Sequence, residues 1–77
     1  MSSPHDHPDP RVRKLAQQNT EAHRRYEAAT NMPARIQAER EQLAAKEAMQ
    51  RIDPSIPYLA HDIKMHRDSI RAYEESR

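Results

Sequence analysis

Histidine and aspartate side chains with metal-ligand spacing occur near the C-terminal end of this 77-residue chain. Asp62 and His66 are four residues apart and would share one face of a helix, whereas His61 would point elsewhere. Two ligands are fewer than a zinc site needs. We therefore predict no metal site, and we expect His66 to sit beside solvent or a polar partner, where its protonation makes packing sensitive to pH.

The other residues whose side chains could bind a metal or catalyse a reaction also do not form a recognisable site. His5 and His7 flank Asp6 in a proline-containing segment, an arrangement that binds transition metals only weakly. The chain has no cysteine for thiolate chemistry and no glycine for a phosphate-binding loop. Three short helices also enclose a water-poor pocket with difficulty. We predict a protein that is not an enzyme and has no cofactor and no small-molecule substrate.

A basic flank on the first predicted helix favours a second kind of function. The flank is formed by Arg11, Lys14 and Arg25, which could contact phosphates or an acidic partner. The formal net charge is only +1, from 13 basic and 12 acidic residues, and no aromatic residues alternate with the bases. Nucleic-acid binding is therefore an alternative hypothesis, and contact with protein is preferred.

The composition predicts a small core and a need for partners. A chain of this length buries only about 60% of the surface that its unfolded form exposes. Hydrophobic residues make up 35% of the chain, charged residues make up 32%, and the three aromatic residues are all tyrosine. No run of about 18 apolar residues and no signal-like N-terminus is present. We expect a cytoplasmic protein that does not bind membranes, or one incorporated in a particle assembled inside the cell.

Capping residues followed by proline predict where the helices begin. An N-cap residue stands one or two positions before a proline in Asp9-Pro10, in Asn31-Met32-Pro33 and in Ser55-Ile56-Pro57. Three helices are expected, at about 10–30, 32–52 and 56–75, in a single helical domain of residues 10–77. Residues 1–9 are expected to form a flexible tail that contains proline and histidine.

The break at Pro33 has an alternative. The three-four spacing of apolar residues continues from Ala29 through Ile36 to Leu43, so the first two helices could instead form one kinked rod. Proline inside such a rod would cost about 3 kcal/mol. The break is preferred because the cap-x-Pro pattern recurs at Ser55.

The third helix carries a narrow apolar stripe. Isoleucine or leucine recurs at steps of three and four, with His66 and Tyr73 at the remaining positions. The stripe spans too few heptads to stand alone as a coiled coil. We predict an all-α fold in which the second and third helices form an antiparallel hairpin with coiled-coil-like packing. Its core is expected to contain Ala45, Met49, Ile52, Ile56, Leu59, Ile63 and Ile70.

The second helix is apolar on two opposite sides. Ile36 and Leu43 share one side, and the side roughly opposite carries Ala34, Ala38, Ala45, Met49 and Ile52. One side is expected to pack within the chain and the other against a second chain. The predicted interface contains Ile36, Arg40, Leu43 and Glu47.

These patterns favour a non-catalytic structural subunit, assembly subunit or adaptor that self-associates or docks into a larger complex, such as a phage particle. The alternative is a small helical regulator or inhibitor of an enzyme or transcription complex, which would dock one amphipathic helix into a groove. Asn19 occupies a seam position of the first helix. It would fix register if it were buried opposite a polar group, and would merely weaken packing if it were not.

Overall fold

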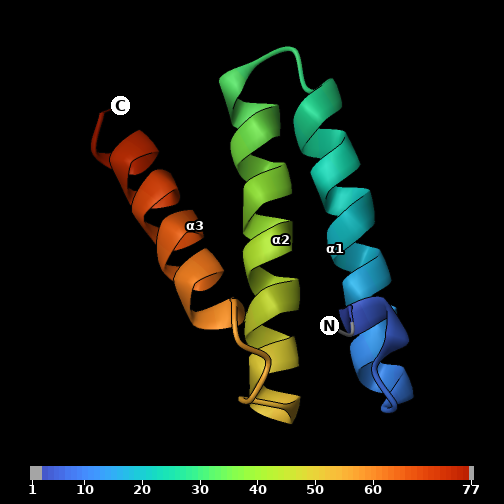
Figure 1. The fold of residues 1–77 in the computed structure, drawn as a ribbon. Helices are drawn as coiled ribbons and strands as arrows, with labels where there is room; N and C mark the ends of the chain where they lie inside the picture. The colour runs from blue at the N-terminus through green and yellow to red at the C-terminus, as the bar shows by residue number, and fades with distance from the viewer. Residues whose placement is uncertain (1–2, 77) are drawn as a thin grey trace.

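The computed structural model describes residues 3–76 and consists of three α-helices that follow one short 3-10 turn (Figure 1). The elements are η1 (Pro4–Asp6), α1 (Pro10–Ala28), α2 (Met32–Ile52) and α3 (Leu59–Glu75). No β-strand occurs within the described part of the chain, which confirms the all-α prediction. None of the helices described is long and apolar enough to cross a membrane.

The first two helices begin where their capping residues predict. A side-chain oxygen of Asp9 accepts from the Arg11 N–H at 2.8 Å, and Asn31 Oδ1 accepts from the Ala34 N–H at 2.9 Å. A proline lies in the first turn of both helices, where its missing N–H leaves no hydrogen bond unmade. Residues 29–31 separate α1 from α2, so the alternative of one kinked rod is wrong.

The third helix begins at Leu59, three residues later than predicted. Ser55 does not cap it, because the Ser55 N–H and hydroxyl both donate to Asp53 Oδ1 in a local turn. Ile56 precedes Pro57, and a residue before proline is disfavoured in the helical region. The connection between α2 and α3 therefore extends over residues 53–58.

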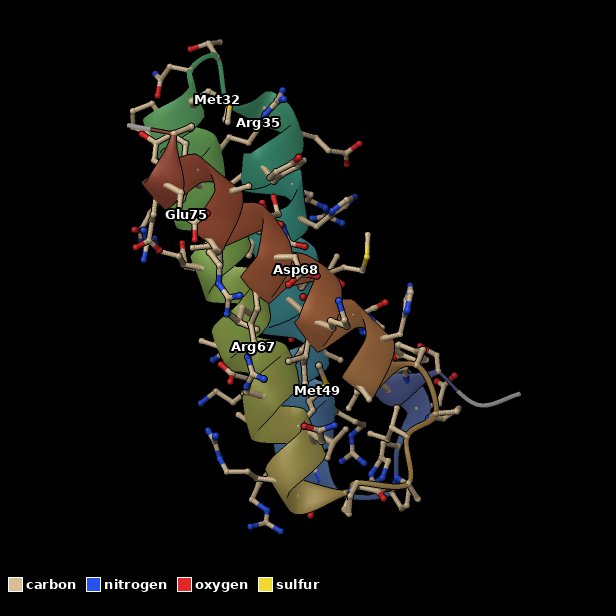
Figure 2. All side chains as sticks on the ribbon, turned by 90° about the vertical axis from the view of Figure 1, so that its left-hand side faces the viewer. Met32, Arg35, Met49, Arg67, Asp68 and Glu75 are labelled. Atoms are coloured by element: carbon tan, nitrogen blue, oxygen red, sulfur yellow. The ribbon has the colours of Figure 1, made fainter. Side chains whose placement is uncertain are left out.

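The middle helix is the element on which the other two pack. α2 lies between α1 and α3, and the backbones of these outer helices do not approach each other within residues 3–76 (Figure 1). α3 lies alongside α2 and contacts it. Viewed from the α3 side, α3 passes in front of α2 (Figure 2). The fold is therefore an open row of helices rather than a closed bundle.

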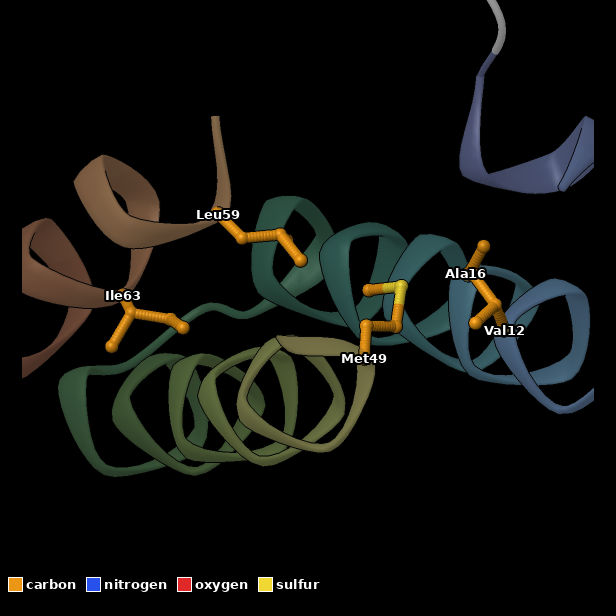
Figure 3. Packing of buried hydrophobic residues seen from close by; sticks show 5 residues of the cluster. All are labelled: Val12, Ala16, Met49, Leu59 and Ile63. Atoms are coloured by element: carbon orange, nitrogen blue, oxygen red, sulfur yellow. The ribbon is translucent and has the colours of Figure 1, made fainter. Parts of the chain in front are cut away.

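The hydrophobic core lies towards the end of the row where α1 and α3 begin. It combines Val12 and Ala16 of α1, Met49 of α2, and Leu59 and Ile63 of α3 (Figure 3). Met49 projects from α2 between the side chains contributed by the two outer helices. Burial of a side chain of this size contributes about 1.5–3 kcal/mol to stability. Leu15, Leu43, Ile52 and Ile56 pack around this cluster.

The N-terminal segment, which its composition predicts to be a flexible tail, has several contacts with the rest of the chain. η1 packs on α1, and His7 Nε2 lies 2.6 Å from Asp53 Oδ2. The Arg13 guanidinium donates to the carbonyls of His7 and Pro8. These contacts fix residues 3–9 against α1 and the connection after α2. Residues 1–2 of the expected tail lie outside the described residues.

Candidate functional site

Polar side chains occupy the middle of the contact between α2 and α3. Glu39 and Lys46 are seven residues apart on α2 and therefore share the face turned towards α3. Their side chains are only 8% and 10% exposed. His66 of α3 reaches both of them and is itself 15% exposed. We name as the interhelical polar cluster the five residues Glu39, Lys46, Asp62, His66 and Ser69.

Both ring nitrogens of His66 have partners in this cluster. Nε2 lies 2.9 Å from Lys46 Nζ, and Nδ1 lies 3.2 Å from Glu39 Oε1. Because a lysine ammonium group can only donate, Nε2 must accept and Nδ1 must carry the proton that is donated to Glu39. The geometry therefore requires neutral His66 in the tautomer with a proton on Nδ1.

The remaining members complete the hydrogen bonding of the buried charges. Asp62 Oδ2 lies 3.2 Å from Lys46 Nζ, and the Ser69 hydroxyl donates to Glu39 Oε2 at 3.0 Å. Both carboxylate oxygens of Glu39 thus have a partner. Removing one member of a buried ion pair leaves an uncompensated charge, which typically costs about 3–5 kcal/mol.

The arrangement of the cluster suits the joining of two helices rather than nucleophilic chemistry. The Ser69 hydroxyl donates to Glu39, which lies between it and the imidazole of His66. The histidine is therefore not placed to take the hydroxyl proton. Asp62 and His66, which the sequence singles out by their spacing, both contact Lys46. The neighbouring His61 is exposed. Within residues 3–76, no group of three or more His, Asp and Glu side chains is arranged to hold a metal ion.

Sequence reasoning missed three members of this cluster: Glu39, Lys46 and Ser69. A charged residue on a helix is normally assigned to solvent, and nothing local to α2 contradicts that assignment. The available signal was the shared register of Glu39 and Lys46 with Ile36 and Leu43, which places charged and apolar residues on one face.

The residues predicted to bind a second chain lie against α3 of the same chain. Ile36 is only 4% exposed, and Leu43 packs on the hydrophobic core. Arg40 forms an ion pair with Glu74 at 3.4 Å, and Glu47 forms one with Arg67 at 2.6 Å. In the isolated chain this side of α2 is therefore covered rather than open.

The residues predicted to form the hairpin core divide between two contacts. Met49, Leu59 and Ile63 belong to the hydrophobic core, with Ile52 and Ile56 packed on it. Ile70 is buried, and with Leu43 it borders a shallow surface groove between α2 and α3. Ala45 instead lines a groove between α2 and α1. The opposite side of α2 thus packs on α1, which sequence reasoning had not assigned to it.

A shallow apolar groove runs along the surface between α1 and α2. Its two parts meet at Arg25 and Glu41, whose side chains form an ion pair at 2.7 Å. Small apolar side chains from both helices line it together with the longer polar side chains of Gln18, Glu21 and Gln37. We name as the alanine groove the surface lined mainly by Leu15, Ala28, Ala34, Ala38, Ala44 and Ala45.

Two of the three residues of the predicted basic flank are paired within the chain. Arg25 binds Glu41, and the Arg11 guanidinium binds Asp9 at 2.7 Å. The hydrogen bond from Arg11 lowers the pKa of Asp9 to about 2. Lys14 is exposed on the same helix. The flank is therefore weaker as a phosphate-binding surface than its sequence indicates.

Asn19 is half-buried on α1, and its side-chain oxygen Oδ1 is fully buried without a hydrogen-bond partner. The register role expected for a seam asparagine requires a polar group opposite it. Among residues 3–76 no such partner reaches Oδ1, so the single chain does not provide that role.

Comparison with protein-family models, curated proteins and solved structures finds no match to this chain. Its function is therefore inferred from its own fold and contacts.

Proposed function

We propose that this chain is a non-catalytic helical interaction subunit that completes its packing by association with protein, either a second copy of itself or a larger assembly. The observation that carries this proposal is the alanine groove. It lies between two of the three helices, and its lining combines the exposed Ala28, Ala34 and Ala44 with the nearly buried Ala38 and Ala45. Small side chains let another helix approach closely, and a helix is the element that packs into such a groove.

The composition of the core supports the same proposal. Its fully buried large side chains are Met49, Leu59 and Val12, and several other buried hydrophobic residues are alanines. An open row of helices with few large buried side chains has little stability of its own. Association that covers the alanine groove adds apolar burial to this small core.

The proposal includes a finer description of the α2–α3 pair as an antiparallel, coiled-coil-like hairpin. Two contacts support this description: Glu39 contacts Ser69, and Lys46, later in α2, contacts Asp62, which is earlier in α3. We also propose that the protein acts in the cytoplasm, in line with the absence of cysteine.

Sedimentation equilibrium of the wild-type chain and of Ala44→Glu tests the proposal. Ala44 is exposed inside the groove, so the substitution places a carboxylate in the apolar contact without disturbing the core. We expect association to weaken by about tenfold or more. The matched control is Ala72→Glu, which changes an exposed alanine of α3 and should leave association unchanged.

Equal association of Ala44→Glu and the wild type would contradict a role for the groove. A wild-type chain that stays monomeric at high concentration would exclude self-association. The larger-assembly form of the proposal is then tested by recovering the tagged chain from its native cells, with Ala44→Glu as the comparison. Loss of the co-purifying protein only in Ala44→Glu is the expected result.

A further inference from the structure

We propose that His66 is a protonation-sensitive latch that holds α3 on α2. The inference rests on the interhelical polar cluster and not on the proposed function, because it concerns a contact inside one chain. Neutral His66 accepts from Lys46 on one side and donates to Glu39 on the other. The contact between the helices therefore depends on which ring nitrogen carries a proton.

Protonation changes the Lys46 side of the ring. The new Nε2–H would point at an ammonium group 2.9 Å away, so two donors with the same charge would face each other without an acceptor between them. Lys46 is almost buried, which keeps water from separating the two cations. A hydrogen bond thus becomes a repulsive contact in a region of low dielectric.

The Glu39 side of the ring gains less from the same proton. Glu39 already accepts from Nδ1 and from the Ser69 hydroxyl, so protonation adds charge attraction but no new hydrogen bond. Asp62 also attracts a cation, but its carboxylate is already paired with Lys46. These are the charged groups that α2 and α3 direct towards His66, and α1 does not approach α3. The Lys46 contact is the shorter of the two, 2.9 Å against 3.2 Å for Glu39, and it changes from a hydrogen bond to a repulsion, so the proposed latch weakens the docking of α3 in acid.

α3 is held on α2 by the apolar side chains of Leu59, Ile63 and Ile70 and by the interhelical polar cluster. The backbone of α3 lies along α2 and does not approach that of α1. Its other ion pairs with α2, Arg40–Glu74 and Glu47–Arg67, lie largely at the surface, where such pairs contribute about 0–1 kcal/mol. Release of α3 at low pH would uncover the side of α2 that carries Ile36 and Leu43.

Hydrogen exchange of α3 amides, corrected for intrinsic rates and compared with α1 amides, measures this docking. Between about pH 8 and pH 5, the range in which histidine changes charge, we expect protection of α3 to fall roughly tenfold more than that of α1. His61→Gln is the matched control, because it removes an exposed histidine of the same helix, and it should keep the wild-type response. His66→Gln retains an acceptor and a donor but cannot become charged, so its α3 protection should lose the dependence on pH.

Lys46→Gln gives the sharpest test, because it replaces the ammonium group with a side chain that can accept from protonated Nε2. Acid should then leave α3 protection unchanged or raise it. An unchanged acid loss in Lys46→Gln or in His66→Gln overturns the latch, as does equal α3 protection at both pH values in the wild type.

One measurement needs no variant. Imidazole nitrogen-15 spectra of the wild type near pH 8 should show His66 with its proton on Nδ1. A proton on Nε2 at that pH contradicts the latch even if a variant fails to fold.

Discussion

His7 Nε2 lies 2.6 Å from Asp53 Oδ2, a contact between residues 46 positions apart in the chain. It joins the segment before α1 to the connection after α2. The contact also brings the two ends of the α1–α2 pair together. Residues 3–9 thus belong to the folded unit.

Acid should weaken this contact through Asp53. Hydrogen bonds from the Ser55 hydroxyl and from His7 lower the pKa of Asp53 from 3.8 to about 2 in the folded chain. The lowered pKa contributes stability that is present above about pH 4 and is lost as the pH falls towards 2. We expect Asp53→Asn to unfold at a lower temperature than the wild type at pH 5, with a smaller further loss on acidification. Circular-dichroism melts across this range test it. Asp6→Asn, which removes an exposed carboxylate of the segment before α1, is the control.

The N-cap of α2 should make a measurable contribution to the free energy of unfolding. Asn31→Ala removes the acceptor of the Ala34 N–H and should lower the free energy of unfolding by about 1 kcal/mol. Asn31→Asp retains an acceptor and should restore most of the loss. Urea denaturation gives both values, and an alanine variant as stable as the wild type would contradict the cap.

The hydrophobic core should be sensitive to a single truncation. Leu59→Ala removes a fully buried side chain and should cost about 2–5 kcal/mol, enough to unfold a large share of so small a domain. Met65→Ala changes a side chain of the same helix that is 57% exposed, and its effect should stay within about 0.5 kcal/mol. Similar losses in the two variants would place the core elsewhere.

Two neighbouring residues of α2 separate a buried hydrogen-bond acceptor from an exposed ion pair. Glu39→Ala leaves the Nδ1–H of neutral His66 without its acceptor and should cost about 1–3 kcal/mol. Arg40→Ala removes an exposed pair with Glu74 and should cost less than about 1 kcal/mol. Urea denaturation compares them directly, and equal losses would contradict the burial of Glu39.

Local signals predicted the fold better than they predicted the contacts. Asp9 and Asn31 cap their helices as expected, because a cap needs only the next two or three residues. Ser55 has the same local pattern but does not cap α3, since its hydroxyl is turned back to Asp53 and the helix begins only at Leu59.

The contacts between helices depend on which helix packs on which side of α2, and no local sequence pattern specifies this. The sequence predicts that α2 is apolar on two sides, but periodicity does not say which neighbour covers which side. Leu43 therefore proves to border α3, and Ala45 proves to line the groove with α1. Lys46 could be identified as a buried residue only when Asp62 and His66 were seen beside it.

The short connection between α2 and α3 gives α3 the character of a tethered ligand. Pro54 and Pro57 restrict the backbone of residues 53–58, so that fewer conformations are lost when α3 docks. Joined to α2 by so few residues, α3 acts at an effective concentration of about millimolar or more. A competing helix from another protein would have to overcome that local concentration to occupy the same face of α2.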